Sequence, residues 1–425
     1  IISALNTCLM YGYIVSQRKK QMVVYGIIGA TGIRRFAISE SEMLVFSVTT
    51  SLVGVALFRT IFQSIVLIYD HLVPASQVDD TRHFKVGNEF VKKYGMKNIH
   101  RADGICHQLM TEAGYVKPGN IVFGTDSHTT TYGCVGAFSS GIGYTEMASI
   151  LGTGTMWVKV PETIKVNITG KLPENVMAKD IILKLIGDLG ADGATYKALE
   201  FAGDTIENMT VASRMSMSNM AIEAGAKNGI FEVDEITKAY MADKVDREYK
   251  VYTADEDAVY DAVYDIDLSE IKSTVAFPHL PENTKTIDEI KEEIKIDQVV
   301  IGSCTNGNIS DMEVAAKILK GRKVADNVRC IIFPGTQNVY KTCIQNGWAE
   351  IFIDAGAVLS TPTCGPCLGG HMGILAPGER AVSTTNRNFV GRMGDVTSEV
   401  YLASPAVAAA SAVTGKISQP SDLGL

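Results

Sequence analysis

Short apolar runs alternate with helical patterns along the last third of the chain. The runs at 299–301, 328–333 and 357–359 have the length and composition of buried strands, whereas 311–319 and 337–345 place apolar residues at helical spacing. Strands that alternate with helices in this way predict a mostly parallel sheet with helices on both faces. We therefore expect an α/β/α domain here.

The same alternation runs through the middle of the chain. Residues 65–68 and 121–123 are predicted as short strands, and 84–94 as a helix. The stretches 178–189 and 215–226 are apolar at helical spacing, and we interpret them as the core faces of helices. The sequence from residue 65 onward therefore predicts α/β architecture throughout.

The first 64 residues have a different character. Residues 43–58 are nearly uncharged and 61–69 continue the apolar pattern, but Arg59 and Gln63 interrupt a span of bilayer length. Because an arginine inside a membrane is costly, the pattern argues against a membrane anchor. A cleavage site after a clean apolar core, which a signal peptide requires, is not evident either.

Composition and charge narrow the class of function. A chain of 425 residues with 46% hydrophobic content can bury a large core and is expected to form two or three domains. Its net charge of −8 argues against nucleic acid as a partner, and a small anionic substrate would need local arginines. Eight cysteines are too few for a disulfide scaffold in a chain of this length, which favours a reducing compartment, the cytoplasm.

Three of the cysteines lie in segments rich in small residues. Cys364 and Cys367 form a C-x-x-C pair in T-P-T-C-G-P-C-L-G-G, and Cys304 follows the apolar run 299–301 within S-C-T-N-G. A C-x-x-C pair alone also serves zinc knuckles and redox sites. A strand's carboxyl end, however, is where open α/β sheets bind ligands. Structural zinc needs four ligands, whereas an iron–sulfur cluster held by three thiolates leaves one iron open as a Lewis acid. We therefore favour the cluster over zinc.

Charged and histidine side chains recur after predicted strands. Asp70 and His71 directly follow the strand at 65–68, and a carboxylate beside a histidine suits proton donation to a departing hydroxyl. On its own, this pair would be better explained by a surface turn. Arg387 and Arg392 lie downstream of the cysteines and flank an aromatic residue. Their planar guanidinium groups match carboxylates, although isolated arginines more often form surface ion pairs.

These segments in their order resemble the aconitase superfamily. The cysteine segments, G-I-C-H-Q at 104–108, G-T-D-S-H-T at 124–129 and N-R-N-F-V-G-R at 386–392 carry the resemblance, which runs from about Ile65 to the C-terminus. Within the superfamily, the chain is similar to the branch of homoaconitase and isopropylmalate isomerase large subunits. The resemblance implies aconitase-like three-layer α/β/α domains with mixed, mostly parallel sheets around an iron–sulfur cluster.

The resemblance also implies which residues form the active site. One 4Fe–4S cluster, with one iron open to substrate or water, would be held by Cys304, Cys364 and Cys367. The catalytic set would be Asp70, His71, His107, Asp126, His128 and Glu200. In this set His71 would donate a proton, and Glu200 would be the carboxylate partner of His107. Substrate carboxylates would meet Ser127, Asn386, Arg387 and Arg392. The five cysteines expected not to bind metal are Cys8, Cys106, Cys134, Cys330 and Cys343.

The implied reaction is dehydration followed by rehydration, which moves a hydroxyl between neighbouring carbons without redox change. The expected substrates are 2-isopropylmalate and 3-isopropylmalate, interconverted through 2-isopropylmaleate in leucine biosynthesis. Two alternatives stay open. A homoaconitase or another hydro-lyase of substituted malates would share every motif, and an inactive cluster-binding protein would be explained by the unusual first 64 residues.

The resemblance implies a protein partner as well. In the superfamily the base is a serine on a swivelling domain, and the chain ends at Leu425 without room for such a domain. We therefore expect an obligate small subunit that completes the site. The expected division is 1–64, which does not match the family, then 65–285 with two α/β domains and 286–425 with the cysteines. The unmatched start, without an initiator methionine, suggests a fragment, a divergent start or a misread frame.

Overall fold

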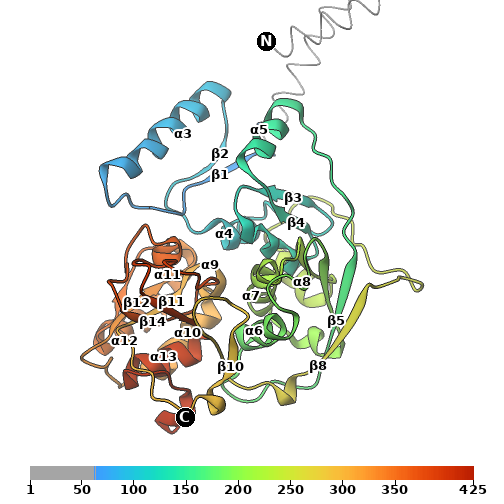
Figure 1. The fold of residues 1–425 in the computed structure, drawn as a ribbon. Helices are drawn as coiled ribbons and strands as arrows, with labels where there is room; N and C mark the ends of the chain where they lie inside the picture. The colour runs from blue at the N-terminus through green and yellow to red at the C-terminus, as the bar shows by residue number, and fades with distance from the viewer. Residues whose placement is uncertain (1–61, 63) are drawn as a thin grey trace, which may run out of the picture. The chain divides into compact units, whose positions relative to one another are not determined.

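The computed structural model describes Phe62 and residues 64–425, and Val66–Leu425 form one compact unit. Cys8 and nearly all of the segment 1–64 lie outside the described residues. Within the described part, no helix is both long and apolar enough to cross a membrane. The unit contains a seven-stranded and a four-stranded sheet together with two separate pairs of strands (Figure 1).

The seven-stranded sheet contains the last third of the chain, as the alternation of strands and helices predicts. Its parallel strands are β11 (Gln298–Gly302), β12 (Arg329–Phe333), β13 (Val358–Leu359), β14 (Arg380–Ser383) and β15 (Glu399–Leu402). One edge is extended in the order β10-β9-β15, in which β9 (Thr274–Ala276) pairs antiparallel with both β15 and β10 (Thr284–Thr286). The expected boundary between residues 285 and 286 stays a prediction, and it falls within β10.

Both faces of this sheet are buried at β11, which is why residues 299–301 form a continuous apolar run. Val299 and Ile301 of β11 point to one face, where they pack with α10 (Ile309–Leu319), α12 (Trp348–Ala355) and α13 (Pro405–Thr414). Val300 points to the opposite face and joins the core that includes α6 (Ala178–Leu189). Helix α11 (Gln337–Gln345) packs beside α12. The predicted three-layer arrangement is therefore confirmed.

The four-stranded sheet is entirely parallel, in the order β7-β6-β5-β8. Its strands are β5 (Thr163–Thr169), β6 (Ala198–Ala202), β7 (Asn228–Phe231) and β8 (Ala262–Asp267). Helix α6 matches the predicted range 178–189, whereas the helix predicted at 215–226 is α7 (Val211–Met220) followed by a 3-10 turn, Ala221–Ala224. Gly225, with φ +86°, ends that turn, and α8 (Glu235–Met241) follows β7.

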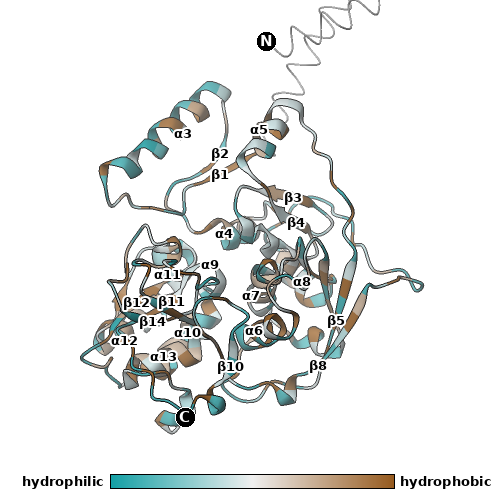
Figure 2. Cartoon of the chain, in the orientation of Figure 1, coloured by the Kyte–Doolittle hydropathy of each residue, from teal (hydrophilic) through white to brown (hydrophobic). Residues whose placement is uncertain are grey.

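Two parallel strand pairs complete the unit. They are formed by β1 (Val66–Ile68) with β2 (Asn98–His100) and by β3 (Ile121–Gly124) with β4 (Phe138–Gly141). The associated helices are α3 (Thr81–Tyr94), α4 (Cys106–Glu112) and α5 (Tyr144–Thr153). Figure 2 shows polar and apolar residues side by side on α3, none of whose side chains is buried.

The candidate site residues follow the carboxyl ends of parallel strands from different sheets. Asp70 lies beyond β1, Asp126 beyond β3, Cys304 beyond β11 and Asn386 beyond β14. Ligand sites of α/β sheets form at these ends, and contacts of Asp70 with Cys364 and of Asn386 with Cys304 join loops that are distant in sequence. The fold therefore positions a composite site built from several loops.

Candidate active site

Three thiols from two distant segments meet in the interior. Cys304 lies on the short helix α9 (Ser303–Asn306), while Cys364 and Cys367 flank the start of the 3-10 turn Gly365–Leu368. All three side chains are buried and form one cluster with Ile105. The seven described cysteines are free thiols. The structure thus brings together the three cysteines that the sequence singles out.

Backbone conformations that glycine permits place Cys304 at this point. Gly302 has φ +116°, and a Cβ there would lie 1.9 Å from the carbonyl oxygen of Phe333. Gly365, with φ +60°, packs against the ring of Phe333, where a Cβ would meet ring carbons at 2.7 Å. Larger side chains would be excluded at both positions. The glycines therefore allow the cysteine segments to pack closely against the end of β12.

Polar N–H groups surround the sulfur atoms. The amide Nδ2 atoms of Asn386 and Asn219 donate to Cys304 Sγ at 3.2 and 3.6 Å, and Arg392 Nη2 donates to Cys367 Sγ at 3.7 Å. A hydrogen bond from the Cys364 thiol, which outweighs burial, holds the pKa of Cys304 well below its usual range. Converging thiols with N–H donors directed at sulfur fit an iron–sulfur cluster, whose sulfurs carry negative charge.

Asp70 and His71 form an ion pair beside the thiols. Asp70 Oδ1 lies 2.8 Å from His71 Nδ1, and Asp70 Oδ2 accepts from the Cys106 N–H at 2.8 Å. The Asp70 carbonyl accepts from the Cys364 N–H at 3.2 Å, which ties this loop to the cysteine segment. Burial opposes a charged imidazole, but the bond to Asp70 and its charge prevail and raise the pKa of His71 to about 9. His71 is therefore protonated at neutral pH.

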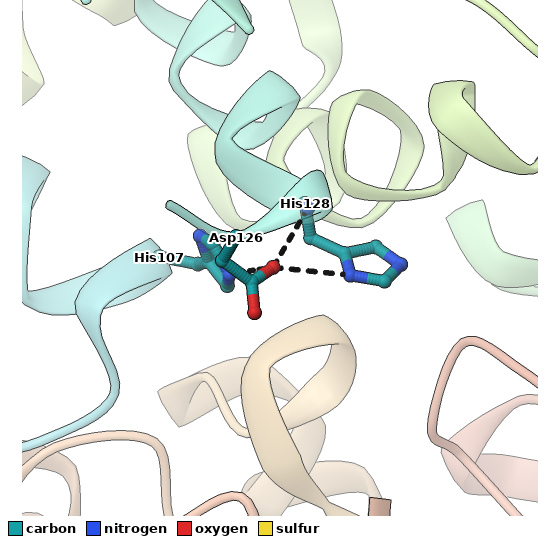
Figure 3. A group of neighbouring side chains, drawn as sticks. All are labelled: His107, Asp126 and His128. Atoms are coloured by element: carbon teal, nitrogen blue, oxygen red, sulfur yellow. Dashed lines mark hydrogen bonds and ion pairs between the residues drawn. The ribbon is translucent and has the colours of Figure 1, made fainter. Parts of the chain in front are cut away.

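Asp126 lies between two buried histidines, as Figure 3 shows. Its Oδ1 atom is 3.0 Å from His107 Nε2 and 3.4 Å from His128 Nδ1, and it accepts from the His128 N–H at 2.8 Å. Its Oδ2 atom lies 3.9 Å from His71 Nε2. Burial would raise the pKa of Asp126, but the histidines hold it well below its usual range. Ser127 Oγ lies 3.4 Å from His128 Nδ1 and belongs to the same group.

A third carboxylate at the site, Glu223, was not predicted from the sequence. Its Oε1 atom lies 2.7 Å from His128 Nε2, and both of its oxygens accept from Arg387 Nε, at 2.8 and 3.1 Å. Burial opposes protonation of His128, yet Asp126 and Glu223 together raise its pKa to about 9. A buried carboxylate within the apolar stretch 215–226 was the signal that could have revealed Glu223, because unpaired charges are rare in a core. Asn219, one turn earlier in the same apolar stretch, was also missed.

The expected pairing of Glu200 with His107 is wrong. The carboxylate that His107 contacts is Asp126. Glu200 lies on β6 and accepts a hydrogen bond from the Tyr260 hydroxyl at 2.8 Å. The structure therefore brings together every other candidate of the catalytic set, with Glu223 as the additional carboxylate.

The two arginines approach the site from the segment after β14. Arg387 contacts Glu223, and Arg392 contacts Cys367. Arg392 Nε is buried and has no hydrogen-bond partner in the described part of the chain, as is also true of His107 Nδ1. Buried polar atoms without a partner are costly. An Arg392 donor left over in this way fits a site that takes an additional anionic group.

Three of the four described cysteines that were not expected to bind metal lie in other parts of the core. Cys330 on β12 and Cys343 on α11 are buried, and burial raises the pKa of each to about 12. Burial likewise raises the pKa of Cys106, the first residue of α4, and that of Cys134. The pKa values of Cys364 and Cys367 are raised as well, so position is what separates the two groups of thiols. Cys330 and Cys343 pack in the core beside α10 and α12, and Cys134 packs in a different core, whereas Cys304, Cys364 and Cys367 share one cluster.

Comparison with known proteins gives a consistent set of relatives. Residues 64–415 match the aconitase family (aconitate hydratase). The 3-isopropylmalate dehydratase large subunit of Caldicellulosiruptor saccharolyticus is 59% identical over 363 residues, which cover 85% of each chain. The protein of the same name from Acetivibrio thermocellus is 55% identical, and the match covers 91% of this chain and 94% of that protein. The one from Clostridioides difficile is 56% identical, and the match covers 84% of this chain and 86% of that protein. A solved structure of Thermococcus kodakaraensis aconitase X aligns over 79% of each chain at 11% identity, with a TM-score of 0.47, a likeness too distant to bear on the site.

Proposed function

The chain belongs to the aconitase family, and on that premise we propose that it is the large subunit of a 3-isopropylmalate dehydratase. The reaction would interconvert 2-isopropylmalate and 3-isopropylmalate through 2-isopropylmaleate, by loss and return of water. Relatives of that name are 55–59% identical over at least 84% of the chain, which supports this activity over that of other family members. The convergence of three thiols with the aspartate–histidine pairs is the observation that carries the proposal.

Membership of the family implies a 4Fe–4S cluster. We infer that Cys304, Cys364 and Cys367 hold it, because they are the described cysteines that share one buried cluster. When bound through three thiolates, such a cluster would supply an open iron as a Lewis acid for the substrate hydroxyl. The amides of Asn386 and Asn219 would stabilise the negative charge on the sulfurs.

His71 would act as the proton donor to the departing hydroxyl. Hydroxide is a poor leaving group, so protonation as the C–O bond breaks lowers the barrier. Asp70 would keep His71 in the charged form and fix its ring through the bond at Nδ1, so that Nε2 is left to face the substrate. Asp126, 3.9 Å from that Nε2 atom, would help to orient the imidazolium.

Substrate carboxylates would be bound by Arg387 and Arg392. Glu223 holds Arg387 by Nε alone, which leaves the terminal nitrogens of the guanidinium for a carboxylate. Arg392 brings an unpaired Nε atom to the same region. Two guanidinium groups would offset the charge of a dicarboxylate in a protein whose net charge is −8. Ser127 would add a hydroxyl donor.

A small subunit would complete the site. The relatives are named as large subunits, which implies a partner chain. We propose that this partner supplies the base that removes the carbon-bound proton, together with further carboxylate-binding residues. The free thiols suit a cytoplasmic location, where they stay reduced.

Turnover by the reconstituted pair tests this function. The chain, co-expressed with its small subunit and reconstituted with iron and sulfide under anaerobic conditions, should convert 3-isopropylmalate to the unsaturated acid and to 2-isopropylmalate. Homocitrate-type acids serve as the specificity control, and they should be poorer substrates. Preference for those acids would contradict the proposed substrate, and a pair with an intact cluster but without hydro-lyase activity would contradict the proposed function.

A further inference from the structure

A lysine is fully buried beneath the candidate site. Lys179 is the second residue of α6, and none of its surface is exposed. Its ammonium group donates to two backbone carbonyls, those of Thr384 at 2.9 Å and Thr385 at 2.6 Å. In the part of the chain that the structure describes, no carboxylate forms an ion pair with it. Buried lysines are rare unless they are paired, so this position requires an explanation.

The two carbonyls belong to the segment that connects β14 with the substrate arginines. Thr384 Oγ1 accepts from the Gly302 N–H at 2.8 Å and donates to the Gly302 carbonyl at 3.1 Å, two residues before Cys304. One residue beyond Thr385, Asn386 donates to Cys304 Sγ. Lys179 therefore fixes a segment that contacts Cys304 through Asn386 and binds the backbone of Gly302 through Thr384.

Local physics disfavours a cation at this place. The start of a helix carries the positive end of its dipole, so a lysine in the first turn of α6 is unfavourable. Burial also lowers the pKa of Lys179 to about 7. Nearby negative charges act in the opposite direction, and that of Cys304 has the largest effect. An apolar residue of similar length would avoid both costs. The ammonium group is therefore held by the two carbonyls to which it donates, and Cys304, Asp311, Asp180 and Glu223 are the negative groups that favour its charged form.

We propose that Lys179 is a positioning residue for the cluster and the substrate arginine. It holds the carbonyls of Thr384 and Thr385, so that Asn386 meets Cys304 and Arg387 meets Glu223. In its charged form it also offsets negative charge at Cys304. This inference rests on the proposed function, because it assumes that the three cysteines hold a 4Fe–4S cluster.

The test compares three variants of the complete heterodimer. Lys179→Met removes the charge and both hydrogen bonds at nearly the same length, and Lys179→Arg keeps a charge and donors. Arg214→Met is the matched control, because Arg214 is also fully buried but binds Asp234 and the carbonyls of Ile206 and Met209. Thermal unfolding of the cluster-free chains measures the structural cost. Half-life of the cluster under chelator, reduction potential and the KM for 3-isopropylmalate measure the proposed role.

We expect Lys179→Met to shorten the half-life of the cluster by about 10- to 100-fold, the range typical of groups that support metal ligands. Its reduction potential should fall, since a positive charge nearby favours the reduced cluster, and KM should rise. Lys179→Arg should recover part of each effect, and Arg214→Met should lower only the melting temperature.

If Lys179→Met and Arg214→Met both melt earlier but keep the wild-type potential, cluster half-life and KM, Lys179 is a structural lysine and the inference is overturned. Equal loss of cluster properties in Lys179→Arg and Lys179→Met would overturn the charge component. A wild-type heterodimer that holds no cluster would contradict the proposed function itself, and it would do so before any variant is compared.

Discussion

Replacing Asp70 by asparagine tests the proposal that His71 is the proton donor of the reaction. The pKa of His71 is raised from 6.5 to about 9, a difference that corresponds to about 3 kcal/mol in favour of the protonated ring. Asp70, 2.8 Å away, is the main source, and Asp126 at 3.9 Å contributes less. In Asp70→Asn we therefore expect His71 to titrate near pH 7, at roughly its ordinary value. Its protonated fraction at pH 8 would then fall about tenfold.

The assay is the pH dependence of kcat/KM for the reconstituted pair, which reports the groups of the free enzyme. Activity requires the protonated form of His71, so it should be lost as pH rises through the pKa of that residue. The alkaline limb should move from near pH 9 in the wild type to near pH 7 in Asp70→Asn.

Asp103→Asn is the matched control for this prediction. Asp103 lies 2.6 Å from His100 Nδ1 in an Asp–His pair that is separate from the candidate site. Its loss should leave the alkaline limb in place. An Asp70→Asn enzyme that keeps the wild-type limb would refute the assignment of His71 as the acid, and a shift toward higher pH would refute the electrostatic reasoning itself.

Three further predictions concern the other groups. Glu223→Gln leaves His128 and Arg387 without their shared carboxylate, and we expect the free energy of unfolding in urea to fall by about 3 kcal/mol; an unchanged urea midpoint would show that this buried contact is unimportant. Arg387→Lys loses the planar fork and should raise KM about 10- to 100-fold with a smaller change in kcat, whereas a change in kcat alone would argue against carboxylate binding. Cys364→Ser should abolish the visible absorption of the reconstituted cluster and leave the circular dichroism of the chain unchanged, in contrast to Cys343→Ser, which should keep the cluster.

The parts of the fold that the sequence predicted are those in which local pattern and packing agree. Helices at 178–189 and 337–345 are found at those bounds, because their apolar faces repeat at helical spacing without interruption. The helix expected at 215–226 ends early at Met220, since the chain tightens into a 3-10 turn before Gly225. Hydrophobic spacing alone does not distinguish these two forms of helix.

The candidate site shows the same division. Cys304, Cys364 and Cys367 were identified from glycine-rich context and spacing, and the structure brings them together. Contacts between residues far apart in sequence were not available from a pattern. Glu223, which is 95 residues from His128, was therefore missed. Glu200 was expected to pair with His107, but it contacts Tyr260.

Lys179 shows a further limit of sequence patterns. A lysine at the start of a helix is expected to be exposed, and only the folded structure shows that Lys179 donates to the carbonyls of Thr384 and Thr385. The physical reason is topological, because α6 and β14 are separated by about two hundred residues in sequence and meet only in the folded chain. Polar contacts between residues so far apart in sequence produce no pattern in the sequence around either residue.

Anaerobic spectroscopy of the cluster tests most directly whether three cysteines hold it and whether its fourth iron meets the substrate. The heterodimer is labelled at the exchangeable iron, and Mössbauer spectra are recorded before and after addition of 3-isopropylmalate. We predict a 4Fe–4S signal in which the labelled iron alone changes its environment when the acid binds. A cluster with four equivalent irons that are indifferent to 3-isopropylmalate, or a chain that binds zinc in place of iron and sulfide, would contradict the proposed cluster.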